Sequence, residues 1–504
     1  MTNITIVGGG TAGWITAAVL SHGLPKERFK ITLIESPNIR SVGVGEATIP
    51  PIVNLLQFLN IDPIDFVQSL QATFKYGIQF EDWSELNTSY MHAFGDLGFP
   101  YEQTPFSDLW LHYRQSLNLS PLNDFSATAI AASKHAFNPP HTLPPNANPN
   151  DYYPLSTLFY AYHFDSQSLA NYLTNIALKN GVHHIKDTVD DVKLNQQQHI
   201  ASLTLQSGRS IEGEIFIDCS GFKGLLSKQV YQLPFTSYQR QLPCDSAIAI
   251  QTKSTVDATP FTRAIAMKNG WRWQIPLQNR RGNGYVFASQ FCKYQQALDE
   301  LEQALLNDTI ITEARLLEFE TGHLTTPWYR NCVAIGLSSG FFEPLESTSI
   351  HLIQKHVFAL KDALLSNNQQ IQQKQLEFNH SFNQDAEEIR DFLLMHYCTT
   401  KRQDSQFWQY CQNMPIPASL SAKLSEYDLT GKITLGENPI FPYQSWLQVL
   451  TGQQVFPTTL TRLDKARCSA QQASLFFQSV NQSILQQVNS LPSHRNYLAN
   501  LMRL

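Results

Sequence analysis

The chain begins with an apolar run that breaks into glycines. Ile4 to Val7 is mostly apolar, Gly8, Gly10 and Gly13 follow, and an apolar helix is predicted from Trp14 to Leu20. A buried strand, a glycine turn and a helix in this order are typical of a dinucleotide-binding unit. The glycines permit a tight turn, close approach of backbone N–H groups to a pyrophosphate, and packing of the helix on the strand. The helix N-terminus adds partial positive charge for the phosphates. A chance glycine loop is the alternative.

A second apolar strand, Lys30 to Glu35, ends in an acid 22 residues after Gly13. This is the expected place for the carboxylate that binds a ribose hydroxyl. With both parts present, the sequence predicts nucleotide binding. The segment 40–51 follows, with two glycines and a double proline. Such a segment suits a backbone that lies along a flat ligand, although an ordinary connecting loop has the same composition.

The next elements alternate between helical and strand patterns. Helices are expected at 51–59 and 64–70, and residues 72–80 alternate as one strand. Lys75 lies within that strand among apolar neighbours. A strand lysine usually lies at a solvated edge, but burial would lower its pKa and make the amine chemically useful.

The middle of the chain contains a long insertion and two further strand groups. Residues 84–160 are rich in aromatics, proline and asparagine, which favours long loops and short helices that cover a ligand. A helix is expected at 165–180. Strands at 183–192, 199–206 and 210–214 should form a small antiparallel layer. A buried strand that ends in a small-residue turn, at 215–222, should return the chain to the first glycine loop.

The apolar pattern within residues 240–290 predicts a second sheet, with strands at 247–252, 263–267, 271–276 and 284–290. Trp271 and Trp273 share one face of their strand, for which core packing is an equally good interpretation.

A further buried strand, at 331–336, leads to a helix that begins at about 346–349 and continues through Leu364. N–H groups at such a helix start can bind an anion, for example flavin oxygens or a halide-sized ion. Glu346 at the same start is also the type of residue that caps a helix. From residue 366 the chain is predicted to be mostly helical, most clearly at 386–397 and 470–488.

Composition narrows the function classes. The 504 residues carry a net charge of −6, which gives no reason to expect nucleic acid or an anionic membrane as partner. Seven scattered cysteines without a C-x-x-C pair argue against a disulfide framework and a zinc site, so no metal is expected. The nucleotide-binding strand begins at the N-terminus and no apolar run reaches 18 residues. A soluble cytoplasmic protein is expected.

Four motifs, taken in order, resemble the flavin-dependent tryptophan halogenases. They are the glycine loop at 8–14, Gly43-Val-Gly-Glu-Ala-Thr-Ile-Pro50, Trp271-x-Trp273-x-Ile275-Pro276, and Phe342-Glu-Pro-Leu-Glu-Ser-Thr348. The tryptophan motif is the specific one, because related flavin monooxygenases share the glycine loop without it. The resemblance covers nearly the whole chain.

This resemblance implies an α/β fold with an FAD-binding Rossmann-like domain of the glutathione-reductase/hydroxylase type, an interleaved antiparallel sheet and a mostly helical C-terminal cap. The FAD-binding domain would span 1–365, with substrate-side segments at 84–160 and 235–320. Residues 366–504 would cover the substrate. The cofactor contacts implied are Gly8, Gly10, Thr11, Ala12, Gly13, Glu35, Arg40, Val44, Gly45, Ala47, Gly336 and Ile350.

In that family, reduced flavin, oxygen and chloride or bromide give hypohalous acid, which travels to a lysine and a glutamate beside the substrate. The matching residues are Lys75 and Glu346. Lys75 would hydrogen-bond the hypohalous acid or form a haloamine, and Glu346 would orient it or accept the arenium proton. The halide would lie near Thr348 and Ser349. The barrier between flavin and substrate would be Trp271, Trp273, Ile275 and Pro276.

The chain has no second glycine fingerprint for a nicotinamide nucleotide, so a separate NAD(P)H-dependent flavin reductase is expected as a partner. A monomer or a homodimer is expected. The members that act on free tryptophan carry a Tyr-Tyr pair, a glutamate and Phe-Trp, for which this chain has Tyr443-Gln444, Leu450 and Val455-Phe456. Leucine cannot accept a hydrogen bond from an ammonium group, so indole, an indole derivative or another electron-rich arene is favoured.

The substrate pocket is expected to include Ile49, Pro50, Phe94, Tyr443 and Phe456. Two other functions stay open on the sequence: an FAD-dependent aromatic hydroxylase and a non-catalytic flavoprotein of the same fold. Oxygenated product without halide would favour the former, and tight FAD binding without oxygen chemistry the latter.

Overall fold

The computed structural model describes residues 1–38, 45–143, 145–148, 151–254, 257–367, 369–459 and 468–503. The chain forms two compact units, each assembled from three separate segments. The first unit comprises Met1–Ala72, Phe164–Asp245 and Glu318–Ile389. The second comprises Thr73–His163, Ser246–Leu317 and Arg390–Leu504.

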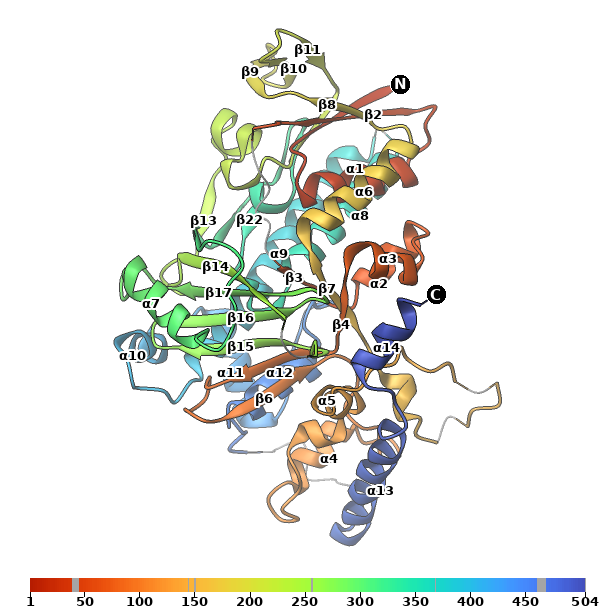
Figure 1. Ribbon diagram of the computed structural model, residues 1–504, viewed down its shortest axis with the longest axis vertical. Helices are drawn as coiled ribbons and strands as arrows, with labels where there is room; N and C mark the ends of the chain where they lie inside the picture. The colour runs from red at the N-terminus through yellow and green to blue at the C-terminus, as the bar shows by residue number, and fades with distance from the viewer. Residues whose placement is uncertain are drawn as a thin grey trace. The chain divides into compact units, whose positions relative to one another are not determined.

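The first unit is built on a six-stranded sheet (Figure 1) with strand order β20-β21-β12-β1-β2-β8. Its strands are β1 (Thr2–Val7), β2 (Phe29–Glu35), β8 (His183–Lys186), β12 (Ile215–Asp218), β20 (Trp328–Tyr329) and β21 (Cys332–Ala334). β1 pairs in parallel with β2 and β12, so that Val7 lies opposite both Ile34 and Asp218. The carboxyl ends of three strands therefore meet at one edge, where α/β sheets bind ligands.

Helices cover this sheet. α1 (Thr11–Gly23) lies beside α6 (Ser166–Lys179) and α8 (Ser349–Leu365), as Figure 1 shows. Trp14 of α1 is only 2% exposed, because neighbouring elements cover the helix on several sides. The first unit also contains α2 (Ile52–Phe58), α3 (Pro63–Leu70) and most of α9 (Ile371–Cys398).

The prediction of a single strand at 183–192 was wrong. The chain forms β8, which pairs in parallel with β2, and then β9 (Val189–Leu194), which forms an antiparallel layer with β10 (Ile200–Leu205) and β11 (Ser210–Glu212). The break has a local cause. The Asp187 N–H donates to the Glu35 carbonyl oxygen at 3.0 Å, which joins the end of β8 to the end of β2. Turns at 196–198 and 206–208 follow β9 and β10.

The second unit is built on a seven-stranded sheet with strand order β18-β14-β17-β16-β15-β5-β6. The strands predicted within 240–290 are confirmed as β14 (Ser246–Lys253), β15 (Thr262–Met267), β16 (Gly270–Pro276) and β17 (Arg280–Phe287). The sheet extends further than the sequence indicated, through β5 (Gly77–Glu81), β6 (Ser89–Ala93) and β18 (Arg315–Glu318). β5 pairs in parallel with β15 and antiparallel with β6.

The single strand predicted at 72–80 divides at Tyr76. β4 (Thr73–Lys75) pairs with β7 (Ala161–Asp165), whereas β5 joins the large sheet. Tyr76 causes the change of partner, because its N–H donates to the Pro260 carbonyl oxygen and its hydroxyl donates to the Asn138 carbonyl oxygen. Lys75 therefore lies at the end of a short strand.

Helices make up most of the C-terminal part, as predicted. Those of the second unit are α10 (Gln406–Asn413), α11 (Ala418–Thr430), α12 (Tyr443–Gly452), α13 (Ala470–Val488) and α14 (His494–Leu501). Earlier in the chain, the second unit also contains α4 (Phe106–Tyr113), α5 (Ala127–Ser133) and α7 (Tyr294–Ala304). The predicted α/β class is confirmed.

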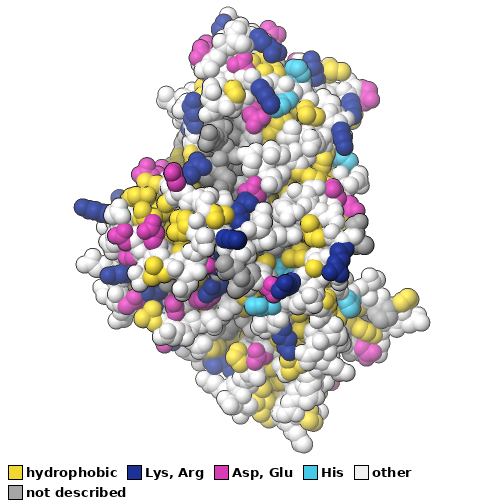
Figure 2. Space-filling view, viewed as in Figure 1, with side chains coloured by type: hydrophobic (Ala, Val, Ile, Leu, Met, Phe, Trp, Pro, Cys, Tyr) yellow, Lys and Arg dark blue, Asp and Glu magenta, His cyan; other side chains and the backbone are white. Residues whose placement is uncertain are grey.

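Charge on the surface is mixed. On the face shown in Figure 2, acidic and basic side chains are interspersed, with apolar side chains between them. Of the helices in the described part of the chain, none is long and apolar enough to cross a membrane.

Candidate active site

The glycine turn after β1 has the conformation that its sequence predicts. Gly8 has φ +118°, and a Cβ at this position would lie 2.2 Å from the Cys219 carbonyl oxygen. A Cβ at Gly13 would lie 1.9 Å from the Gly8 carbonyl oxygen. A Cβ at Gly10, in contrast, would have no atom within 4 Å. Packing therefore explains two of the glycines, whereas the third borders open space that a ligand can enter.

The first turn of α1 can hold an anion. Gly10 is its N-cap and has no side chain to accept from the N–H groups of the first turn, which contains no acid. Such N–H groups and the helix dipole attract phosphate. Gly336, with φ +76°, brings the segment after β21 close, because a Cβ there would lie 2.7 Å from the Ala12 methyl group. The residues of the loop therefore fit a dinucleotide pyrophosphate.

Glu35 ends β2, as the fingerprint requires, and its carboxylate has a partner that the sequence did not reveal. Glu35 Oε2 lies 2.8 Å from His184 Nε2, and the edge of the His184 ring packs against Trp14 with centroids 5.0 Å apart. The Glu35 side chain stays 32% exposed. His184 was missed because the parallel pairing of β8 with β2, which places it there, has no local signal.

Asp218 is a structural carboxylate beside the same loop. It is 0% exposed and accepts hydrogen bonds from the N–H and hydroxyl groups of both Ser220 and Ser227, and from the Leu226 N–H. These five bonds fix the turn after β12, whose Cys219 carbonyl oxygen contacts Gly8. The carboxylate therefore holds the shape of the glycine turn.

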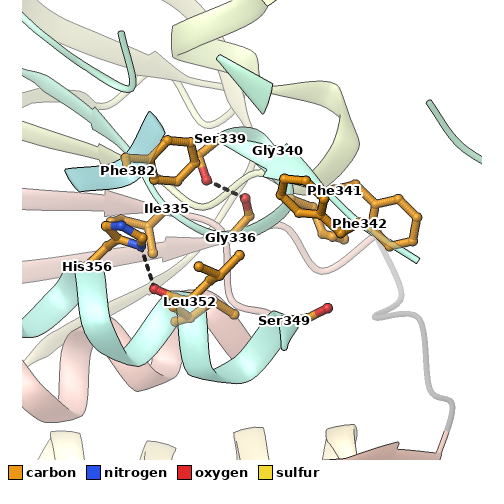
Figure 3. Close-up of a pocket in the computed structure, with 12 residues that line it drawn as sticks. Ile335, Gly336, Ser339, Gly340, Phe341, Phe342, Ser349, Leu352, His356 and Phe382 are labelled. Carbon is orange, nitrogen blue, oxygen red and sulfur yellow. Dashed lines mark hydrogen bonds between the residues drawn. The ribbon is translucent and has the colours of Figure 1, made fainter. Parts of the chain in front are cut away.

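The segment between β21 and α8 encloses a small cavity of about 40 Å³ (Figure 3). Gly336, Phe341 and Ser349 line one part of it, and His356 and Phe382 line another. It has room for water or a halide but not for an aromatic ring. α8 begins at Ser349 with Thr348 as N-cap, and the Thr348 side chain makes no capping bond. N–H groups of the first turn are thus available to an anion at this position.

Glu346 lies before α8, in a separate 3₁₀ turn (Pro344–Glu346), and is 1% exposed. It is therefore not the N-cap of α8. Ser347 follows with φ +59°, and this left-handed residue separates the 3₁₀ turn from the helix.

On α8 and α9, the Asp385 carboxylate lies 2.6 Å from Lys355 Nζ and 3.3 Å from His356 Nε2. Burial opposes ionisation of Asp385, but the neighbouring His356 imidazole and Lys355 ammonium hold its pKa below the ordinary value.

The segment before α2 carries several predicted cofactor and substrate residues. Arg40 and Val44 lie outside the described residues. Gly45 and Ala47 form β3 (Gly45–Ala47), and Ile49 and Pro50 follow it in the first unit. Burial and the charge of Asp165 raise the pKa of Glu46 to about 7. Ile350 is 4% exposed in α8.

Lys75 is 0% exposed at the end of β4 in the second unit. Its Nζ lies 5.3 Å from the centroid of the Phe94 ring, a cation–π distance. Burial of a lysine is rare, and a buried amine is the form in which lysine does chemistry. The solvated-edge interpretation of Lys75 is therefore excluded.

A buried polar network fixes the strand that carries Lys75. The Thr73 hydroxyl donates to the Pro276 carbonyl oxygen at 2.7 Å and contacts His163 Nδ1 at 3.0 Å, while His163 Nε2 contacts the Thr262 hydroxyl at 2.9 Å. Because the only Thr73 proton goes to Pro276, Nδ1 must be the donor and Nε2 the acceptor. Burial, together with the charges of Lys75 and His494, holds the pKa of His163 well below its ordinary value. The imidazole is therefore neutral.

The tryptophan motif lies on β16. Trp271 and Trp273 are 1% and 6% exposed, and their rings are 6.2 Å apart. Trp273 requires Gly284 opposite it on β17, because a Cβ there would lie 2.0 Å from the indole ring. Both tryptophans are packed core residues, and Pro276 at the end of the motif anchors Thr73.

A cavity of about 670 Å³ lies within the second unit, in the loop that follows β6. Phe94 follows β6, and Asp96, Leu97 and Phe99 line the cavity. Gln448 of α12 fixes this region by exchanging hydrogen bonds of 3.0 and 3.1 Å with the Ala93 backbone.

Gln444, one turn earlier on α12, lines the cavity directly. The predicted pocket residues Tyr443 and Phe456 have other contacts: the Tyr443 hydroxyl donates to the Gly431 carbonyl oxygen, and the Phe456 ring lies 3.7 Å from the Arg114 guanidinium. Leu450 is 0% exposed.

Comparison with known proteins agrees with this arrangement. Residues 3–469 match the family model "Tryptophan halogenase". The 7-chloro-L-tryptophan 6-halogenase KtzR of Kutzneria sp. (strain 744) is 33% identical, with 99% of each chain covered. The structure of BrvH, a flavin-dependent halogenase from Brevundimonas sp. BAL3, superposes with a TM-score of 0.92 at 36% identity, covering 99% of each chain. The structure of the tryptophan 6-halogenase SttH from Streptomyces toxytricini superposes with a TM-score of 0.88 at 31% sequence identity, and the match also covers 99% of each chain.

Proposed function

The chain belongs to the tryptophan halogenase family, and from this premise we propose that it uses reduced FAD, oxygen and chloride or bromide to halogenate an indole or another electron-rich arene. The observation that carries the proposal is Lys75, an amine without solvent exposure at the end of a fixed strand, 5.3 Å from the Phe94 ring. A lysine is costly to bury and is rarely buried, and it is one of the side chains that enzymes bury in order to use the amine in chemistry.

The first unit would hold the flavin. The N–H groups of Thr11, Ala12 and Gly13, in the first turn of α1, would bind the pyrophosphate in the open space beside Gly10, and Glu35, oriented by His184, would accept from the ribose. Gly45, Ala47, Gly336 and Ile350 would contact the rest of the cofactor. When bound, reduced FAD would give two electrons to oxygen, and the resulting oxidant at the peroxide level would convert the halide into hypohalous acid. A separate flavin reductase would supply the reduced flavin.

The halide would bind at the start of α8. Thr348 and Ser349 offer backbone N–H groups of a first helical turn, and the neighbouring cavity of about 40 Å³ admits an ion of this size. The helix dipole favours the anion.

Lys75 would receive the hypohalous acid. It either donates a hydrogen bond that polarises the oxygen–halogen bond, or its neutral amine attacks the halogen, so that an N–halogen bond forms and water leaves. Glu346, a buried carboxylate, would orient the acid or take the proton that the arenium intermediate loses when its ring becomes aromatic again.

Trp271, Trp273, Ile275 and Pro276 would keep the substrate from reacting directly with the flavin. Their close packing makes β16 rigid, which supports a wall rather than a moving gate. The expected product is therefore halogenated and contains no oxygen from O2.

The test is a product assay. Protein, reduced FAD, oxygen, bromide and indole are incubated, and the products are analysed by mass spectrometry with and without the halide. A brominated arene that requires bromide supports the proposal. An oxygenated arene formed without halide would instead indicate a hydroxylase, and no product from a broad panel of arenes would contradict catalysis.

A further inference from the structure

The cavity of the second unit carries information on substrate charge. It begins two residues after Phe94, whose ring lies under the Lys75 ammonium group, because Asp96 is part of its lining. Its volume of about 670 Å³ is typical of sites that enclose a small organic molecule. An indole with a side chain of several atoms fits this space.

The walls favour a flat ring. Phe99 and Tyr152 are stacked, with centroids 4.7 Å apart and planes inclined by 15°, and Phe106 and Leu97 add apolar surface. Aromatic ligands gain from offset stacking and edge contacts on such walls.

The charged groups are all acidic. Asp96 and Asp151 line the cavity, whereas the lining residues that the structure describes include no lysine, arginine or histidine. Two cations beside α4 are already used, because Lys432 is paired with Asp108 and the Arg114 guanidinium lies on the Phe456 ring. A carboxylate on the ligand would therefore meet two negative charges and no positive one.

Asp96 is the acid available to a ligand. Asp151 receives a hydrogen bond from the Asn148 amide at 3.3 Å, but no described residue donates to the Asp96 carboxylate. Asp96 lines the cavity and is also exposed to solvent, and partial desolvation by the surrounding protein raises the pKa of its carboxyl group. An ammonium group in the cavity would reach this carboxylate and form a charge-assisted hydrogen bond with it.

We propose that this cavity selects an arene that bears an ammonium group and no carboxylate, and that Asp96 is the specificity-determining residue that binds the ammonium. The acidic residue that binds the ammonium group would thus lie in the loop after β6 and not on α12. Helix α12 presents Gln444 to the cavity and buries Leu450. The inference rests on the proposed halogenase function, and it names the charge class of the substrate.

The experiment compares three indoles that share one ring: tryptamine, 3-ethylindole and indole-3-propionate. With reduced FAD, oxygen and bromide, kcat/KM for tryptamine is expected to exceed that for 3-ethylindole about tenfold, as one charge-assisted hydrogen bond provides, and indole-3-propionate is expected to be the poorest. Asp96→Asn should reduce the tryptamine to 3-ethylindole ratio to near one. The matched control Asp190→Asn, at an exposed position on β9 that does not line the cavity, should leave this ratio within about twofold.

Equal kcat/KM values for the three indoles, or a ratio that Asp96→Asn leaves unchanged, would overturn the inference while halogenation itself stands. If none of the three yields product, the halogenase proposal is in question, and calorimetric binding of tryptamine and 3-ethylindole to the FAD-loaded protein decides the inference separately. Tighter binding of tryptamine that Asp96→Asn abolishes supports it, and equal binding overturns it.

Discussion

The Thr73 hydroxyl donates a 2.7 Å hydrogen bond to the carbonyl oxygen of Pro276. This bond joins β4, two residues before Lys75, to the end of β16, which carries both tryptophans of the family motif. His163 holds Thr73 from the other side at 3.0 Å. The position of the proposed catalytic amine is thus set by the tryptophan strand.

Replacement of Thr73 by valine should loosen this connection. Thr73→Val keeps the shape but leaves the Pro276 carbonyl and the His163 N–H buried without a partner, at a cost of about 1–3 kcal/mol. Denaturant unfolding of the variant should show this loss, and halogenated product per oxygen consumed should fall because Lys75 is less well placed. Thr73→Ser, which retains the hydroxyl, is the control. A Thr73→Val protein with unchanged stability and coupling would contradict the role of the bond.

His163 should make stability depend on pH below neutrality. Its pKa in the folded protein lies well below the ordinary value, whereas in the unfolded chain it takes a proton near pH 6.5. Below pH 6.5 the unfolded state therefore binds more protons. The stabilisation is complete above that pH, and the free energy of unfolding falls as the pH drops, by up to about 1.4 kcal/mol per unit for this group.

His163→Asn isolates this contribution. The variant should be less stable at pH 7.5 but should lose less stability between pH 6.5 and 5, as measured by denaturant unfolding at each pH. His494, whose pKa burial lowers to about 4, contributes to both proteins and cancels in the comparison. Parallel pH profiles for the two proteins would show that His163 takes a proton in the fold.

Two glycines of the first loop should respond differently to alanine. Gly10→Ala places its methyl group in open space, so the melting temperature of the flavin-free protein should stay within about 2 °C, while FAD binding weakens about tenfold or more. Gly13→Ala meets the Gly8 carbonyl oxygen and should cost about 1–3 kcal/mol or more of folding free energy. Flavin fluorescence titration and thermal unfolding separate the two effects. Equal loss of stability in both variants would show that Gly10 is also a packing residue.

The sequence predicted those parts of the fold and site that depend on neighbouring residues. The glycine loop, Glu35 and β16 follow from local spacing and alternation. The pairing of β8 with β2 does not, because Leu33 and His184 are brought together only by the tertiary fold. For the same reason the pattern at 72–80 hid the break at Tyr76, and neither His163 nor Asp96 could be identified. Their roles depend on strands and loops that are distant in sequence.

The most direct test of the proposal that Lys75 guides hypohalous acid to the arene is the fate of that acid in the Lys75→Ala variant. With FAD bound, the variant should still oxidise bromide, detected with a β-dicarbonyl trap in solution, while halogenated arene falls at least about 100-fold, as loss of a positioned acid–base group implies. Lys293→Ala, at an exposed position before α7 in the same unit, should match the unmodified protein. Undiminished arene halogenation with the same regioselectivity in Lys75→Ala would contradict the proposed role of Lys75.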